Sequence, residues 1–389
     1  MTKRITTIIC ILCFLSVQLL SARSVTAQRH ENQMNSRSDK PIRAVLLNPG
    51  GSHWFWKMTI DFMQAAAADL NIELEVVTSD YNHLLTIEQA KEIVARANPP
   101  DYIITGNEKS NAGEIIRIAD EAGVKIFLFS NGFVDPKDKQ EYGNPREKFP
   151  FWIGELIPNN YSAGYTMGKM LIDEALHKNL RAVDGKINIV AIAGAYLTHA
   201  SEERLRGLND AMAEYPDTVQ LLQVFHGDWT YDKAVQLSQG VFRRYPKVQI
   251  LWGANDTTAL GAMDVAASLG MRPGQNILFG GCGWYEPALQ KVEEGKLTTS
   301  VGGHFMEGGW VMVMLNDYHH GIDFIDDPWK TSMFSIDATN VGKYLQIFGK
   351  QDWRQIDFRK FSKAYTPALK RYDFSLEAVI QQIESQKPQ

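Results

Sequence analysis

Residues 187–225 read INIVAIAGAYLTHASEERLRGLNDAMAEYPDTVQLLQVF. The runs at 187–193 and 219–225 are short and predominantly apolar, which is typical of buried strands. The segment between them, 201–215, has the length of a helix. Two strands separated by one helix predict a βαβ unit with parallel strands and a right-handed crossover.

The same alternation continues in both directions from this unit. The expected strands on its N-terminal side are 42–47, 73–78, 102–105 and 125–129, with helices at 55–70, 86–97, 112–122 and 163–177. On its C-terminal side we expect strands at 250–253, 277–280 and 298–301, with helices at 231–245, 257–269, 286–294 and 306–319. The pattern predicts an α/β fold of two doubly wound parallel-sheet lobes. Such lobes bind ligands at the carboxyl ends of their strands and close around a small solute.

The N-terminus has the pattern of a cleaved export signal. Lys3 and Arg4 precede an apolar stretch at 5–20, and Val25-Thr26-Ala27 provides small residues before a cleavage site. We therefore predict a signal peptide at 1–27, cleavage after Ala27 and a periplasmic location. The polar segment 28–40 is expected to be a disordered linker.

Composition excludes several classes of function. The chain is 44% hydrophobic and 22% charged, with a net charge of -5, so nothing indicates nucleic acid or an anionic membrane as partner. Cys282 is the one cysteine after the signal, which excludes an internal disulfide in the mature protein. No nucleophile elbow, Walker loop or zinc-binding helix motif occurs, and we expect neither catalysis nor a cofactor.

Two weaker patterns leave alternatives open. Cys282 with His304 would be the pair of a thiol-dependent enzyme, although a glycine-flanked cysteine is more often a packing residue. His319 and His320 precede Asp323, Asp326 and Asp327, which would suit a metal, but a solvated helix end is the preferred interpretation and we predict no metal site.

The first candidate site cluster is Trp54-Phe55-Trp56, directly after the first strand. Three consecutive helical residues point in different directions, so they cannot all face the core. Flat aromatic faces suit the C–H faces of a sugar ring or another partly apolar small molecule. The alternative is that two of them pack in the core.

Further candidates follow the strands of the second half. Arg204 lies in the first turn of a helix for which Ser201 is the expected N-cap, and its guanidinium can reach a ligand or form a surface ion pair with a glutamate. Asn255 offers donors and an acceptor, whereas Asp256 is expected to cap the following helix. Trp229 is a loop aromatic that can stack on a ligand.

At these clusters, residues 41–340 resemble the ribose-type (class I) periplasmic binding proteins of ABC sugar transporters. The resemblance rests on the aromatics after the first strand, the Glu-Arg-x-x-Gly helix start at 203–207 and the stretch ANDTTALGA at 254–262. It implies stacking by Phe55 and Trp56, closure by Trp229, and polar contacts from Arg204 and Asn255.

The resemblance also implies a domain organisation. Three strands, near 154–158, 302–305 and 335–340, would form the hinge between the lobes. The N-terminal lobe would comprise 41–155 plus 304–337, and the C-terminal lobe 156–303 plus 338–360. A helical tail at 361–389, with a helix at 376–384, would follow.

At four further positions, where the resemblance implies contact with the ligand, this chain lacks the residue that is common in the sugar-binding members of the family. Ser130 and Asn131 stand where an Asp-Arg pair is common, Cys282 replaces an Asp, and His304 replaces a Gln. The losses imply a ligand less hydroxylated than a standard aldose, or one bound mainly by aromatic faces and Arg204.

The periplasmic autoinducer-2 receptor is similar in having a Trp at Trp56 and an Arg at Arg204, but Gly303 replaces its second arginine. The partner implied by these resemblances is an ABC permease or, alternatively, a membrane sensor kinase or cyclase. We expect the protein to act as a monomer.

Overall fold

The structure is a computed structural model in which residues 40–51, 53–327 and 330–386 are described. The described residues from Arg43 onward belong to one compact unit. The predicted signal peptide, its cleavage site after Ala27 and nearly all of the linker 28–40 lie outside the described residues. None of the helices in the described ranges combines the length and apolar character needed to cross a bilayer.

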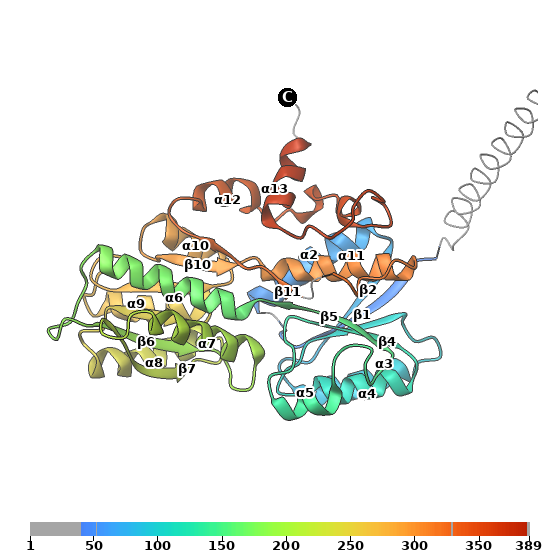
Figure 1. Ribbon diagram of the computed structural model, residues 1–389, viewed down its shortest axis with the longest axis horizontal. Helices are drawn as coiled ribbons and strands as arrows, with labels where there is room; N and C mark the ends of the chain where they lie inside the picture. The colour runs from blue at the N-terminus through green and yellow to red at the C-terminus, as the bar shows by residue number, and fades with distance from the viewer. Residues whose placement is uncertain (1–39, 52, 328–329, 387–389) are drawn as a thin grey trace, which may run out of the picture. The chain divides into compact units, whose positions relative to one another are not determined.

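The first half of the chain alternates strands and helices and forms the first sheet (Figure 1). Its elements are β1 (Ile42–Asn48), α2 (Trp54–Asp69), β2 (Ile72–Thr78), α3 (His83–Val94), β3 (Tyr102–Thr105), α4 (Ala112–Glu121), β4 (Lys125–Phe129), α5 (Pro136–Tyr142) and β5 (Trp152–Pro158). The strand order is β11-β5-β4-β3-β1-β2, in which the edge strand β11 (Lys330–Thr331) comes from much later in the chain. Helix α4 shows why these helices form: Ala112, Ile115, Ile116 and Ala119 share one buried face at helical spacing.

The second sheet repeats this plan. Its elements are α6 (Asn160–His177), β6 (Ile187–Ala193), α7 (His199–Ala213), β7 (Val219–His226), α8 (Tyr231–Arg244), β8 (Ile250–Gly253), α9 (Asp256–Ser268), β9 (Leu278–Cys282), α10 (Glu286–Glu293) and β10 (Thr299–Gly302). The order is β12-β10-β9-β8-β6-β7, with β12 antiparallel to β10 and the other pairs parallel. Two parallel-sheet lobes, as predicted, are thereby confirmed.

The remaining elements follow β10. They are the short helix η1 (His304–Met306), α11 (Glu307–His319), β11 (Lys330–Thr331), β12 (Phe334–Ile336), α12 (Val341–Phe348), the short helices η2 (Trp353–Gln355) and η3 (Phe358–Phe361), and α13 (Leu376–Ser385). Because β11 joins the first sheet and β12 the second, the chain crosses between sheets at 331–334, in addition to the crossings after β5 and β10.

The sequence-based lobe limits stay a prediction, and the packing favours one revision of them. Helix α12 packs on α10 of the second lobe, whereas η2 and η3 pack on α2 of the first. Residues 353–361 are therefore better counted with the first lobe than with 338–360 in the second. The chain between α12 and η2 makes a fourth passage from one lobe to the other.

Aromatic side chains make the contacts along this fourth passage of the chain between the lobes. Tyr344 lies edge-on to Trp284 of the second lobe, with ring centroids 4.8 Å apart. Phe348 lies 5.1 Å from Tyr344 and 5.9 Å from Trp353, and Trp353 lies 5.4 Å from Phe62 of α2. The C-terminal segment thus contacts both lobes through a continuous aromatic series.

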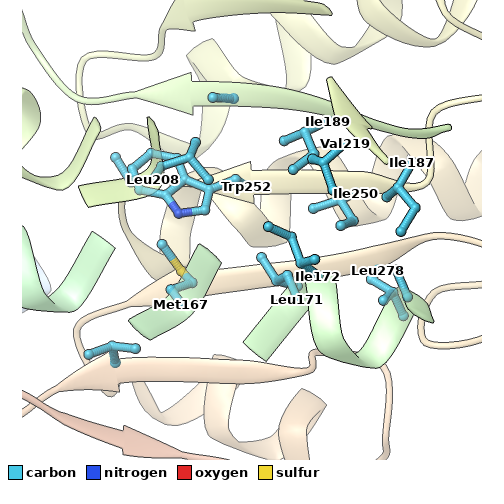
Figure 2. Close-up of a cluster of buried hydrophobic side chains, with 14 of the residues drawn as sticks. Met167, Leu171, Ile172, Ile187, Ile189, Leu208, Val219, Ile250, Trp252 and Leu278 are labelled. Atoms are coloured by element: carbon cyan, nitrogen blue, oxygen red, sulfur yellow. The ribbon is translucent and has the colours of Figure 1, made fainter. Parts of the chain in front are cut away.

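Helix α6 packs on one face of the second sheet. Figure 2 shows Leu171 and Ile172 of this helix facing Ile250 and Met167 facing Trp252, and all five side chains are fully buried. Burying one such side chain contributes about 1.5–3 kcal/mol. The residues of β6 are all buried, which explains why Asn188 is its only polar residue.

Helices α6 and α7 touch at backbone level, and this contact sets the position of Arg204. A Cβ on Gly164 of α6 would overlap the backbone carbonyl of Arg204 in α7. Gly240 of α8, by contrast, has open space around the place of a Cβ.

We expect Gly164→Ala to lower the free energy of unfolding by about 1–3 kcal/mol, because α7 must move to admit the methyl group. The matched variant Gly240→Ala should raise it by about 0.5–1 kcal/mol, since alanine is the better helix former. Urea denaturation followed by circular dichroism measures both. Equal effects of the two substitutions would contradict the close-contact interpretation.

Candidate functional site

A pocket of about 70 Å³ lies where the loops of both lobes meet. One water needs roughly 10–15 Å³ by this measure, so the pocket suits one small molecule and is too small for an oligosaccharide. Its lining residues are His53, Trp54, Phe55, Trp56, Tyr81, Glu108, Ser130, Asn131, Pro158, Asn160, Ala200, Arg204, Trp229, Asn255, Cys282 and His304. They lie at or after the carboxyl ends of β1 to β10, which is where a doubly wound sheet presents its binding loops.

The structure brings all nine sequence-predicted site residues together in this lining: Phe55, Trp56, Ser130, Asn131, Arg204, Trp229, Asn255, Cys282 and His304. That they contact a ligand stays a prediction. Tyr81, Glu108 and Asn160 are among the lining residues that were not predicted from the sequence. Each of these follows or ends a strand, so the same carboxyl-end rule would have found them.

The aromatic cluster forms the first-lobe wall. Trp56 is buried, while Trp54 and Phe55 are half-buried. Phe55 stacks on His304 with centroids 4.6 Å apart, and Trp54 stacks on Tyr285 of the second lobe at the same distance. The three rings therefore serve different contacts, and all three border the pocket.

Arg204 is the main charged group of the second-lobe wall, and it is only 3% exposed. Its Nε donates to Asn160 Oδ1 at 2.8 Å and its Nη1 to the Ala254 carbonyl at 2.7 Å. Its Nη2 lies 3.3 Å from His304 Nε2. The guanidinium carbon also lies 5.7 Å from the centre of the Trp229 ring. These contacts hold the guanidinium in one place, and the surface ion pair considered from sequence is not formed.

Trp229 is positioned by its backbone. It adopts a left-handed conformation, with φ of 65°, and its carbonyl accepts from Asn255 Nδ2 at 2.9 Å and from Thr257 Oγ1 at 2.8 Å. Its ring occupies the space that a side chain at Gly194 would fill. The tryptophan is therefore held in place by contacts within the protein.

Two capping predictions need correction. Asn255, and not Asp256, caps α9: its Oδ1 accepts from Thr258 N at 3.0 Å. Asp256 is buried and instead accepts from Ser300 Oγ at 2.8 Å and from Tyr285 N at 2.7 Å, and burial raises the pKa of its carboxyl to about 6. Helix α7 begins at His199 after Thr198, which leaves Ser201 buried inside the helix.

Asn131 links the lobes across the pocket. Its Oδ1 accepts from Ala200 N at 3.2 Å, and its Nδ2 donates to Glu108 Oε1 at 2.6 Å. Burial raises the pKa of Glu108 above its usual range. Ser130 beside it has a φ of 66°, so its backbone is also left-handed.

Comparisons with known proteins agree with this geometry. Residues 44–321 match the family described as "Periplasmic binding protein domain". The chain belongs to the periplasmic binding protein family. The structure is similar to a crystal structure of a periplasmic sugar-binding protein from Pseudomonas fluorescens, with 33% identity and a TM-score of 0.76 over 87% of this chain and 99% of that one.

Sequence relatives of this periplasmic binding protein are more distant. The ribose import binding protein RbsB of Escherichia coli is 23% identical over 73% of this chain and 84% of its own length. The galactofuranose-binding protein YtfQ of the same organism is 22% identical over 48% of this chain, and the match spans 54% of YtfQ. The family binds solutes and does not catalyse reactions.

The alternative enzyme and metal interpretations lose their structural basis. Cys282 is 1% exposed, and burial raises the pKa of its thiol to about 12, so it stays protonated. Within the described residues no three His, Cys, Asp or Glu side chains gather as a metal site. Asp323 instead pairs with Arg146 at 2.6 Å.

We expect Cys282 in the folded periplasmic binding protein to resist a thiol-specific reagent near neutral pH, because the thiol is both buried and protonated. Unfolding in urea should make it react at once with one equivalent. Absorbance of the released chromophore measures the labelling. Fast labelling of the folded protein would contradict the assigned environment.

Proposed function

We propose that this periplasmic binding protein encloses a sugar-like solute between its lobes and presents it to an ABC permease. The observation that carries the proposal is the pairing of aromatic faces with a fixed, buried guanidinium in one small pocket. Aromatic faces bind the C–H surface of a sugar ring, and the guanidinium binds its oxygens. The named sugar-binding relatives support the same solute class.

Closure by the ligand requires that both lobes contact it. Phe55 and Trp56 would contribute from the first lobe, and Arg204, Trp229 and Asn255 from the second. The Trp54–Tyr285 stack and the Ala200–Asn131 hydrogen bond already join the lobes at the pocket rim. A bound solute would add its own contacts to these and stabilise the closed arrangement.

Arg204→Ala and Trp229→Ala should each weaken binding about tenfold or more, which corresponds to about 1.4 kcal/mol. Arg206→Ala is the matched control, because Arg206 lies on the same helix but pairs with Glu203 on the surface. Thermal shifts across a panel of monosaccharides identify a ligand, and calorimetric titration then measures each variant. Unchanged affinity in both pocket variants would contradict the assigned cleft.

A signalling role is the second candidate. The likeness to the autoinducer-2 receptor at Trp56 and Arg204 favours it, and presentation to a membrane sensor would use the same closed state. Deleting the gene and measuring uptake of labelled ligand separates the two: lost uptake supports the permease, while intact uptake with a lost transcriptional response supports the sensor.

A further inference from the structure

Arg204 is a buried cation whose protein partners are all neutral. Its three hydrogen-bonding contacts are an amide oxygen, a backbone carbonyl and an imidazole nitrogen. Among the described residues it forms no ion pair with a carboxylate. A guanidinium has five N–H groups, so one on each terminal nitrogen remains. A buried charge without an opposite charge is costly, which makes this arginine a site for an anion.

The buried carboxylate of Asp256 forms no ion pair with Arg204. Asp256 is fully buried and attracts Arg204 electrostatically, but its oxygens accept from Ser300 and from the backbone of Tyr285. The residue at the end of β9 is Cys282, whose protonated thiol carries no charge. Asp256 therefore acts on Arg204 only at a distance, and among the described residues no carboxylate contacts the guanidinium, whose remaining N–H groups are available to a ligand.

His304 adds a second unused donor. Arginine has no acceptor atom, so Nε2 of His304 must accept from Arg204 and its Nδ1 must carry the hydrogen. The side chain is 8% exposed, and Nδ1 is buried without a hydrogen-bond partner. The indole Nε1 of Trp54 is likewise buried and unpartnered.

Several acceptor oxygens at the pocket already accept one hydrogen bond from the protein. The amide oxygens of Asn131, Asn160 and Asn255 accept from Ala200, Arg204 and Thr258 respectively. Glu108 is the one acidic lining residue, and its Oε1 accepts from Asn131. The donors that lack a protein partner, on Arg204, His304 and Trp54, therefore suit a ligand that presents several acceptor oxygens.

We propose that the solute is a sugar acid whose carboxylate pairs with Arg204, an inference that rests on the proposed function. A sugar acid here means a monosaccharide-sized hydroxy acid such as an aldonate or a uronate. The two remaining N–H groups of the guanidinium would donate to the carboxylate oxygens, and His304 Nδ1 to a neighbouring oxygen. The aromatic wall would cover the carbon skeleton. Charge-assisted bonds of this kind are about twice as strong as neutral ones.

The test compares matched pairs by calorimetric titration of the mature protein: D-galacturonate with D-galactose, and D-gluconate with D-glucose. At least one acid should bind about tenfold or more tightly than its neutral counterpart. Tight binding of a neutral sugar with no binding of its acid would overturn the sugar-acid proposal and leave the sugar-receptor function standing. Binding of neither class would overturn both.

Variants separate charge pairing from general damage. Arg204→Gln should weaken binding of the acid about thirtyfold or more, because it removes the charge, while a neutral sugar, which loses hydrogen bonds but no charge pairing, should weaken by a clearly smaller factor. Arg206→Gln is the matched control and should bind like the parent. Equal loss for acid and neutral sugar would contradict the proposal.

Far-UV circular dichroism shows whether Arg204→Gln folds. If it does not, a second variant tests the same charge pairing. Cys282→Asp places a carboxylate near Arg204 and should reverse the preference from acid to neutral sugar. Retained preference for the acid in a folded Cys282→Asp protein would overturn the proposed charge pairing.

Discussion

The parallel arrangement of the strands is the constraint on which the rest of this molecule depends. Parallel strands all end at the same edge of their sheet, so each loop that follows a strand joins its neighbours there. Two sheets arranged in this way bring residues as distant in sequence as Trp56 and His304 to one small pocket. The site is thus a product of topology, and its chemistry is set by single residues at strand ends.

This dependence explains how much the sequence could predict. Apolar runs and helical segments predicted both sheets, and the strand-end rule together with the family resemblance predicted residues such as Arg204 and Trp229. The residue that caps a given helix was harder to predict from the sequence. Asn255 and Asp256 are adjacent and both are good caps, and only the contact of Asp256 with Ser300, from a distant strand, decides between them.

Other misses have the same origin. Tyr81 and Glu108 follow strands, as the strand-end rule requires, but they belong to no motif that distinguishes them from the other polar residues of their loops. The passage of the chain back to the first lobe through Trp353 depends on aromatic packing between segments hundreds of residues apart. Local pattern defines elements well, whereas contacts between remote elements require the assembled fold.

The aromatic C-terminal segment has a mechanical consequence. A receptor whose lobes are joined by three backbone crossings can open by bending those three places alone. Here Tyr344 packs against one lobe and Trp353 against the other. Separating the lobes therefore also requires either that the chain at 349–352 changes conformation or that these ring contacts break. The segment acts as an additional connection between the lobes. The free energy of opening therefore includes the cost of changing its conformation or of breaking its ring contacts.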